Sequence, residues 1–353
     1  MHNLSFYKNK KILITGHTGF KGSWMCSLLV MAGAEVTGYA LEAPTDPSLF
    51  ELCHLAEKIN SVTGDVRDLN HLMQVFEEVQ PEIVIHMAAQ PLVLESYKNP
   101  VHTYETNVMG TVNVLECVRL CKSVKSFLNV TTDKVYLNKE LERGYRENEE
   151  LNGFDPYSNS KSCSELVTSS YLNSFFQDRN ISISTARAGN SIGGGDFAID
   201  RIIPNCIRAA TQKEDIMVRN PLSVRPYQHV LESVAAYLMI AQAQYEDKRY
   251  AGSYNVGPDE TDCLTTGDLV ALFCKKWNAV TGDNISWLST CENGPREANI
   301  LKLDCSKIKR TFDWSPRWNV ETAMEKVVEW TCCYMQGGNV AECMEKQIRE
   351  FLG

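Results

Sequence analysis

The sequence of 353 residues predicts an α/β fold in which helices cover both faces of a parallel sheet, with a smaller α/β lobe after it. Short β-branched segments alternate with longer amphipathic segments over the first half of the chain, a pattern typical of βαβ units. Glycines at positions 16, 19 and 22 follow the first of these strands. Because βαβ crossovers are right-handed, the two observations together predict a doubly wound Rossmann sheet.

The elements of this sheet can be assigned in order along the chain. Strands are expected within residues 10–15, 35–40, 59–66, 82–89, 125–132 and 182–189, and helices at 19–33, 70–79, 100–121 and 158–176. After Gly193 the alternation is less regular, with a short strand expected at 216–218 and helices at 229–245, 266–277 and 320–335. We therefore expect a domain at 1–190 and a smaller lobe at 191–353 that is partly interleaved with it.

Composition and charge exclude several classes of function. Hydrophobic residues make up 44% of the chain and charged residues 22%, as in ordinary globular proteins. The net charge of −9 argues against non-specific nucleic-acid binding, which needs a basic face. No segment reaches the ~20 apolar residues of a membrane-spanning helix, and no apolar leader segment follows the start. Thirteen scattered cysteines without a CxxC pair predict reduced thiols rather than a metal site, and hence a cytoplasmic protein.

The glycine-rich segment TGHTGFKG, residues 15–22, indicates a dinucleotide site. Small residues between a first strand and a helix let the backbone approach a diphosphate, and the helix N-terminus favours its negative charge. The choice of cofactor rests on fewer residues. Glu42 is a candidate for the ribose hydroxyls and no arginine occurs between 39 and 66, which favours NAD, whereas Lys21 keeps NADP open.

Two further motifs carry groups suited to proton transfer. In DPYSNSK, Tyr157 and Lys161 lie one helical turn apart, so the ammonium is expected to lower the pKa of the phenol. In TTDK, Thr132, Asp133 and Lys134 follow the fifth predicted strand. Ligands of an open parallel sheet bind outside the carboxyl ends of its strands, so these five polar groups are expected to surround one substrate.

The motifs together resemble the extended short-chain dehydrogenase/reductases, and among them the sugar-nucleotide 4,6-dehydratases. The resemblance is strongest to the branch that acts on CDP-sugars, through GHTGFKGSW (16–24), TTDKVY (131–136), RAGNSIGGGDFA (187–198) and RPYQHVLE (225–232). Lys134 is typical of that branch, since the thymidine-sugar branch has Glu there. The chain departs from the family pattern at Leu94, Ser191, Phe197 and Arg296, where Arg, Val, Trp and His are usual.

The resemblance implies an internal redox cycle with NAD as the cofactor and CDP-glucose as the substrate. It assigns catalysis to Thr132, Asp133, Lys134, Tyr157 and Lys161. It places the cofactor against Gly16, His17, Thr18, Gly19, Phe20, Lys21, Gly22, Asp65, Val66, Ala88, Ala89, Gln90, Asn107, Tyr157 and Lys161. It places the substrate against Asn190, Arg201, Arg219, Arg225, His229 and Arg296. No metal is implied.

The resemblance also implies a homodimer formed by the helices at 100–121 and 158–176. Other readings stay open at this point: a 4,6-dehydratase for another nucleotide-hexose, a sugar-nucleotide 4-epimerase, or an NAD-binding scaffold without activity. An epimerase needs no acid at C6, so Asp133 and Lys134 argue against it. Thr132, Tyr157 and Lys161 argue against a silent scaffold.

Overall fold

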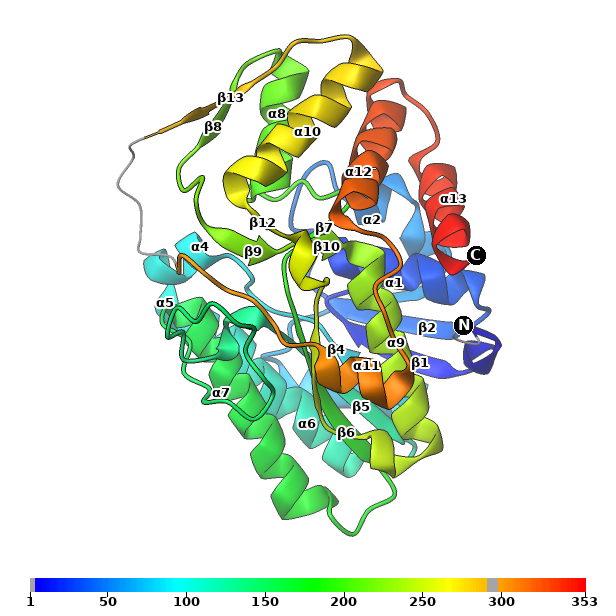
Figure 1. Ribbon diagram of the computed structural model, residues 1–353. Coiled ribbons are helices and arrows are strands. Elements are labelled where there is room, and N and C mark those ends of the chain that lie inside the picture. The colour runs from blue at the N-terminus through cyan, green and yellow to red at the C-terminus, as the bar shows by residue number, and fades with distance from the viewer. Residues whose placement is uncertain (1–3, 291–297) are drawn as a thin grey trace.

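A seven-stranded parallel sheet forms the centre of the protein in the computed structural model, which describes residues 4–290 and 298–353 (Figure 1). The strand order is β11-β6-β5-β4-β1-β2-β3, which confirms the predicted doubly wound fold. The strands are β1 (Lys11–Thr15), β2 (Glu35–Ala40), β3 (Asn60–Thr63), β4 (Ile83–His86), β5 (Ser126–Thr132), β6 (Ser182–Ala188) and β11 (Ser253–Val256). The register pairs Thr15 with His86 and Thr132 with Ala188, so the carboxyl ends of the central strands lie at one edge.

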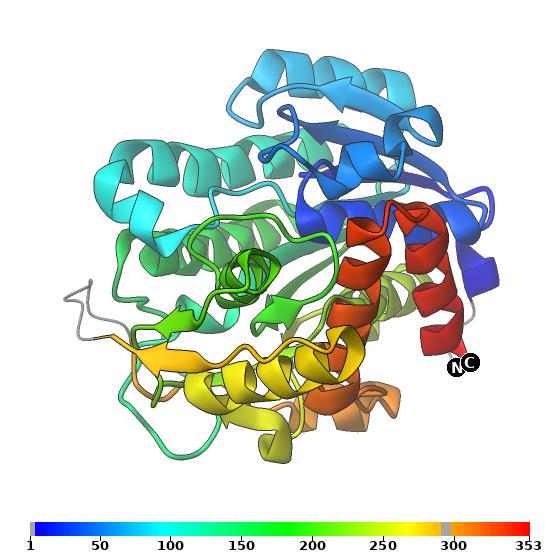
Figure 2. The ribbon, with the colours of Figure 1, turned by 90° about the horizontal axis from the view of Figure 1, so that it is seen from above.

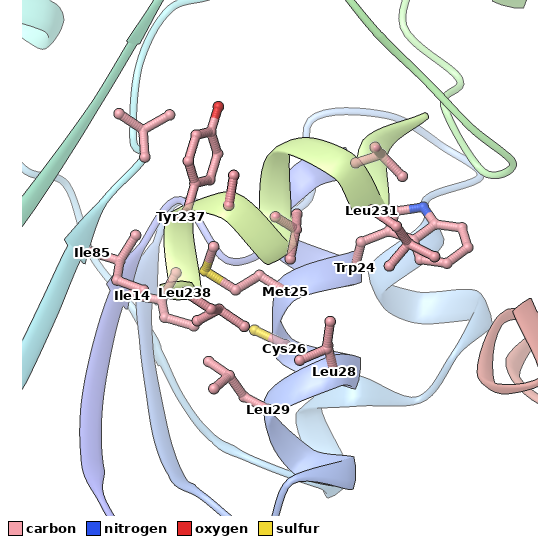
Figure 3. Packing of buried hydrophobic residues seen from close by; sticks show 14 of the residues in the cluster. Ile14, Trp24, Met25, Cys26, Leu28, Leu29, Ile85, Leu231, Tyr237 and Leu238 are labelled. Atoms are coloured by element: carbon pink, nitrogen blue, oxygen red, sulfur yellow. The ribbon is translucent and has the colours of Figure 1, made fainter. Parts of the chain in front are cut away.

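Helices cover both faces of this sheet. On one face lie α3 (Leu69–Val79), α6 (Gly110–Leu120) and α7 (Pro156–Tyr171), which share an apolar cluster with the strands. On the other lie α1 (Phe20–Met31) and α9 (Val230–Glu246), whose apolar side chains pack together (Figure 3). Helix α13 (Val340–Leu352) contacts α1. The central strand β4 is buried along its whole length, which explains its nearly continuous apolar sequence, IVIH.

The chain after residue 190 contributes to both parts of the molecule. Its strand β11 forms an edge of the main sheet and α9 packs on β5 and β6, although the sequence did not predict β11. The remaining elements form a lobe at the top of Figure 1, around an apolar cluster of its own. That lobe contains α8 (Ile202–Gln212), α10 (Thr266–Thr281), α12 (Val320–Met335), β8 (Ile216–Val218), β9 (Val224–Pro226), β12 (Cys263–Thr265) and β13 (Trp287–Ser289). The division at residue 190 remains a prediction.

Further short elements complete the fold, and Figure 2 shows the lobe lying across one edge of the sheet. They are α2 (Leu49–Leu52), α4 (Val93–Lys98), α5 (Pro100–Tyr104), α11 (Ser306–Phe312), β7 (Ser191–Ile192) and β10 (Gln228–His229). A π-helical turn at Glu105–Met109 joins α5 to α6, and another at Leu172–Phe176 extends α7, so the helices expected at 100–121 and 158–176 are present. β7 and β10 pair in parallel at the junction.

Candidate active site

The glycine loop has the shape that a dinucleotide requires. Gly16 has a φ of +79°, and a Cβ there would lie 2.7 Å from the Ala88 nitrogen. A Cβ at Gly22 would lie 2.3 Å from the Gly16 oxygen, so close packing of loop and helix excludes side chains at both positions. At Gly19, the N-cap of α1, a Cβ would meet nothing closer than 3.5 Å, which leaves that face open. The unpaired N–H groups of the first turn of α1 therefore fit a diphosphate.

The side chains of His17 and Thr18 point away from this open face. His17 Nε2 lies 2.8 Å from Ser61 Oγ, and burial lowers the pKa of His17 to about 4. Thr18 Oγ1 donates to the Leu41 oxygen at 3.0 Å. Both residues hold the loop to the neighbouring strands, so only their backbone groups face the predicted cofactor site.

At the predicted adenine end, Asp65 is engaged by a neighbour. Arg67 Nη2 lies 2.6 Å from Asp65 Oδ2, and this hydrogen bonding lowers the pKa of Asp65. Val66 is buried, with its carbonyl accepting from Asn113 Nδ2 at 2.9 Å. Glu42 accepts a hydrogen bond from Thr63 Oγ1 at 3.2 Å, at the end of β3.

The loop after β4 is tied to α7, the helix that carries Tyr157 and Lys161. The backbone N–H of Gln90 donates to Asn107 Oδ1 at 2.8 Å, and Asn107 Nδ2 donates to the Gln90 oxygen at 3.1 Å and to Ser160 Oγ at 2.9 Å. Asn107 lies in the π-helical turn, and such turns are frequent at functional sites. These bonds place Ala88 and Ala89, next to Gly16, at the same edge as α7.

The TTDK segment forms a compact polar group at the end of β5. Thr132 Oγ1 donates to Asp133 Oδ1 at 2.9 Å, and Lys134 Nζ donates to the same oxygen at 3.2 Å. Lys134 Nζ also donates to Asn190 Oδ1 at 3.2 Å. Asp133 is 1% exposed, and its second oxygen, Oδ2, is buried with no hydrogen-bond partner among the described residues. A buried carboxylate oxygen without a partner is suited to a ligand hydroxyl.

Tyr157 and Lys161 lie beside this group on α7, whose N-terminus is fixed by Asp155. The Asp155 carboxylate accepts from the Ser158 backbone N–H at 2.9 Å, and Pro156 occupies the first turn. Lys161 is buried, donates from Nζ to the Val130 oxygen at 3.2 Å, and has a pKa lowered to about 8 by burial.

The expected lowering of the Tyr157 pKa is wrong for the protein alone. Burial raises the pKa of Tyr157 to about 12, although hydrogen bonding with Thr132 and the charge of Arg201 lower it. Lys161 directs its ammonium to the Val130 carbonyl instead of to the phenol. Desolvation of the phenolate thus outweighs the cations that the sequence places around it.

The predicted substrate residues divide into two groups. Asn190 and Arg201 lie at the site: Asn190 accepts from Lys134, and Arg201, the N-cap of α8, pairs with Asp196 at 3.0 Å while its charge acts on Tyr157. His229 is fully buried between the rings of Trp24 and Trp318, so the structure does not bring it to a ligand.

The remaining arginines are placed differently. The buried Arg225 donates from Nη2 to the Ala298 oxygen at 2.6 Å and from Nη1 to the Val224 oxygen at 2.9 Å, so it braces backbone. Arg219 is exposed beyond β8. Arg296 lies outside the described residues.

A buried ion pair that the sequence did not reveal supports α7. Arg187 Nη2 lies 2.8 Å from Glu165 Oε2 and Arg187 Nε lies 2.9 Å from Oε1, with both side chains at most 4% exposed. Glu165 also accepts from Thr131 and Thr185. Glu165 follows Lys161 by four residues, which was the only sequence signal that it shares the catalytic face of the helix.

The described residues contain neither a cluster of metal-ligating side chains nor a membrane-spanning helix. No group of three or more His, Cys, Asp or Glu side chains among them could hold a metal ion. No helix in residues 4–290 and 298–353 is both long and apolar enough to cross a membrane.

Comparison with solved structures identifies the fold more closely. The UDP-glucose 4-epimerase of Thermotoga maritima with UDP-glucose aligns with a TM-score of 0.79, 20% identity, and coverage of 92% of this chain and 99% of that one. The dTDP-glucose 4,6-dehydratase of Bacillus anthracis in complex with NAD aligns with a TM-score of 0.75, 20% identity, and coverage of 95% and 99%. At 20% sequence identity, these structural similarities establish the fold of the chain and nothing more.

Sequence comparison extends over the whole chain. A CDP-glucose 4,6-dehydratase of Salmonella typhimurium is 45% identical over 358 residues, covering 100% of this chain and 99% of that protein. A CDP-paratose 2-epimerase of Salmonella typhi is 26% identical and covers 91% of this chain and 99% of its own. The model of the GDP-mannose 4,6 dehydratase family matches residues 13–327. The chain therefore belongs to the GDP-mannose 4,6 dehydratase family.

Proposed function

We propose that the protein is an NAD-dependent CDP-glucose 4,6-dehydratase, which converts CDP-glucose to CDP-4-dehydro-6-deoxy-glucose and water. The observation that carries this proposal is the ion pair between the buried Asp133 and the partly exposed Lys134, beside Tyr157 and Thr132 at the carboxyl edge of the sheet. The 45% identity to a CDP-glucose 4,6-dehydratase across the full chain supports the same reaction and substrate.

The first step needs a base for the 4-hydroxyl of the sugar. Tyr157 would accept that proton, with Thr132 holding the same hydroxyl, since the two side chains are already hydrogen-bonded neighbours. Bound NAD supplies the two-electron acceptor for C4 and later the donor for C6. The Tyr157 pKa of about 12 must fall for this step, and Lys161, whose ammonium lies one turn away, is placed to stabilise the phenolate.

The second step removes water across C5 and C6. The 4-keto group acidifies the C5 proton, and Asp133 would protonate the departing C6 hydroxyl through its unpartnered Oδ2. The shared proton of the ion pair would first move from Lys134 Nζ to the Asp133 carboxylate, which makes Asp133 the acid and leaves Lys134 as a neutral amine. That amine would then take the C5 proton and return it to C5 when the hydride enters at C6; if Lys134 instead remains an ammonium, it would stabilise the enolate. Its ammonium is held between Asp133 and Asn190, so it is oriented before a substrate arrives.

The nucleotide diphosphate needs cations and hydrogen-bond donors at the edge of the cleft. We propose Arg201, which pairs with Asp196, and Asn190, which accepts from Lys134, for this role, together with the exposed Arg219 of the lobe. We propose NAD over NADP because Glu42 lies two residues beyond the end of β2, where its carboxylate would repel a 2′-phosphate. Titration with both cofactors tests this, and tighter NADP binding would contradict it.

One assay separates this function from its rivals. The protein is incubated with CDP-glucose and with other nucleotide-hexoses, and products are followed for a 4-keto-6-deoxy sugar. A 4,6-dehydratase gives that product with CDP-glucose as the preferred substrate, whereas a 4-epimerase gives the 4-epimer with its C6 hydroxyl retained. A scaffold gives neither product, and a different preferred nucleotide would correct the substrate.

We further propose a homodimer formed by α5–α6 and α7. These helices expose apolar side chains that surround a hollow beside Cys163 and include Val101, which is 69% exposed. A second copy would cover this face, giving a dimer by light scattering. Val101→Glu should yield monomers, whereas Val280→Glu on α10, 64% exposed, should not. A stable wild-type monomer at micromolar concentration would refute the dimer.

We propose a cytoplasmic location as well. All twelve cysteines among the described residues are free thiols, as expected in a reducing compartment. Fractionation of the native cells would test this, and recovery of the protein in an oxidising compartment would contradict it.

A further inference from the structure

His86 is a buried titratable residue that the proposed reaction does not use. It is the last residue of β4, at the carboxyl edge of the sheet, and is 1% exposed. Both ring nitrogens have partners: Nδ1 lies 2.7 Å from Thr15 Oγ1, and Nε2 lies 3.1 Å from Thr111 Oγ1. Burial lowers the pKa of His86 to about 3, and the charge of Lys161 lowers it further, so the ring is neutral near pH 7. A neutral imidazole donates at one nitrogen and accepts at the other.

The partners of His86 determine which nitrogen carries the proton. Thr15 Oγ1 accepts from the backbone N–H groups of Met87 at 3.1 Å and Ala88 at 3.2 Å. A hydroxyl that accepts two hydrogen bonds has only its own proton left to give, so Thr15 donates to His86 Nδ1. The ring proton is therefore on Nε2, which donates to Thr111 Oγ1. The two nitrogens thus make bonds of opposite direction, to two different parts of the fold.

The Nδ1 bond belongs to the cofactor side of the site. Thr15 ends β1 immediately before Gly16, and its two bonds from backbone N–H groups hold the loop after β4 against the glycine loop. The fit is tight there, because a Cβ at Gly16 would lie 2.7 Å from the Ala88 nitrogen. The bond to His86 fixes the rotamer of Thr15 that makes these contacts. The shape of the glycine loop therefore depends on Nδ1.

The Nε2 bond belongs to the helix side of the site. Thr111 is the second residue of α6, and its Oγ1 donates to the Asn107 oxygen at 2.7 Å. Ser164 Oγ lies 3.0 Å from Thr111 Oγ1, so Ser164 donates to a hydroxyl whose own proton is already engaged. Ser164 follows Tyr157 by seven residues, about two turns of α7, and so lies on the same face of that helix. Through Thr111, the ring of His86 thus contacts both the π-helical turn and α7.

We propose that His86 is a positioning residue that joins the glycine loop to the helix carrying Tyr157. Its Nδ1 keeps Thr15, and with it the loop after β4, in place for NAD. Its Nε2 keeps α6 and α7 at the position in which Tyr157 meets the sugar. A neutral ring makes both bonds without adding a second positive charge beside Lys161. The role of the Nε2 bond rests on the proposed function, whereas the role of the Nδ1 bond requires only that the protein binds NAD.

Two substitutions of His86 in the full-length protein separate the two bonds. Asparagine places an oxygen near the position of Nδ1 and nothing at Nε2, whereas glutamine places an amide N–H near Nε2 and no acceptor at Nδ1. His86→Asn should bind NAD within about two-fold of wild type in calorimetry, but reduce it about ten-fold more slowly after mixing with CDP-glucose. His86→Gln should bind NAD about ten-fold more weakly and, once saturated with NAD, reduce it within about two-fold of the wild-type rate.

Removal of the partner hydroxyls should reproduce the same division. Thr15→Val should behave as His86→Gln does, and Thr111→Val as His86→Asn does. Each threonine variant should add little to the histidine variant that breaks the same hydrogen bond. Thr331→Val is the matched control, because Thr331 is also buried and its hydroxyl donates to the Val327 oxygen at 2.8 Å, but within α12 of the lobe. It should change neither the NAD affinity nor the rate of NAD reduction.

Thermal unfolding shows which variants are folded, and if the histidine variants are not, Thr15→Val and Thr111→Val decide. Folded variants that keep both NAD affinity and reduction rate within about two-fold of wild type would show that His86 only stabilises the core, and the inference would be wrong. Equal losses of affinity and rate in all four variants would refute the separate roles of the two nitrogens. If wild type binds NAD but CDP-glucose does not reduce it, the proposed function fails, while the NAD affinities of His86→Gln and Thr15→Val still test the Nδ1 bond.

Discussion

The Asp133→Asn variant tests the assignment of the dehydration acid. Asparagine keeps the size of the side chain and an oxygen that can accept from Thr132 (2.9 Å) and Lys134 (3.2 Å), so the fold of the segment should survive. The buried Oδ2 position, however, would carry an amide nitrogen that cannot deliver a proton as an acid does. We therefore expect oxidation at C4 to proceed and loss of water to stall.

The size of the stall follows from the role assigned to the carboxyl group. Loss of one general acid typically lowers the rate of its step by about 10²–10⁴-fold. If the steps of wild type have comparable rates, a 10²-fold slower elimination leaves about 99% of the sites with reduced cofactor at steady state, because the hydride returns only after water has left. Lys134→Ala should delay the same step, and exchange of deuterium into C5 should slow with it.

The assay follows cofactor fluorescence after rapid mixing with substrate, with product formation measured in parallel. Asp268→Asn is a matched control, because Asp268 also accepts from a threonine hydroxyl, Thr265 at 2.6 Å, but lies on α10. A variant that never reduces the cofactor would show that TTDK positions the substrate. An Asp133→Asn variant that forms product at a rate within about three-fold of the wild-type rate would show that Asp133 is not the acid.

Three further predictions concern the base, the support of α7 and a buried carboxyl. Tyr157→Phe should lower turnover by about 10²–10⁴-fold while calorimetry shows NAD affinity nearly unchanged; normal cofactor reduction would refute the role. Glu165→Gln breaks the buried ion pair with Arg187, so urea unfolding should show a loss of about 3–5 kcal/mol in stability. The control, Glu345→Gln, breaks a more exposed pair with Arg349 and should cost less than about 1 kcal/mol. Burial raises the pKa of Glu232 to about 7, so its contribution to stability is present below its unfolded pKa and is lost as pH rises through about 7. As the pH rises from the unfolded pKa of Glu232 to about 7, the free energy of unfolding of wild type should fall by up to about 3 kcal/mol relative to that of Glu232→Gln. Stability curves of the two proteins that stay parallel over this pH range would refute this.

Much of the sheet could be predicted because its local signals agree with the fold. Six strands and their connecting helices follow from the alternation of apolar segments, and the glycine spacing predicts the open loop before α1. The seventh strand, β11, has only four residues and enters the sheet from the second half of the chain. Its pairing with β6 depends on tertiary contacts that no local pattern encodes.

Site residues that directly follow a strand of the sheet could be predicted, because the topology of the sheet determines where the end of each strand lies. Asp133 and Lys134 follow β5, so their place at the carboxyl edge follows from topology. The orientation of single side chains does not follow in this way. His229 sits in a motif of the family and yet its ring is enclosed by Trp24 and Trp318, because it caps α9 from inside the core.

The position of Tyr157 depends on groups that take no part in the chemistry. Tyr157, Lys161 and Glu165 occur at intervals of four on α7, so they lie on one face of the helix over about 12 Å. Glu165 is held by Arg187 of β6 and by Thr131 of β5, which fixes both the rotation of α7 and its height above the sheet. A buried ion pair contributes little net stability compared with apolar packing, so its value here is geometric. It sets the register that brings the phenol of Tyr157 to the Thr132 hydroxyl, and the proposed reaction at the end of β5 depends on this register being kept.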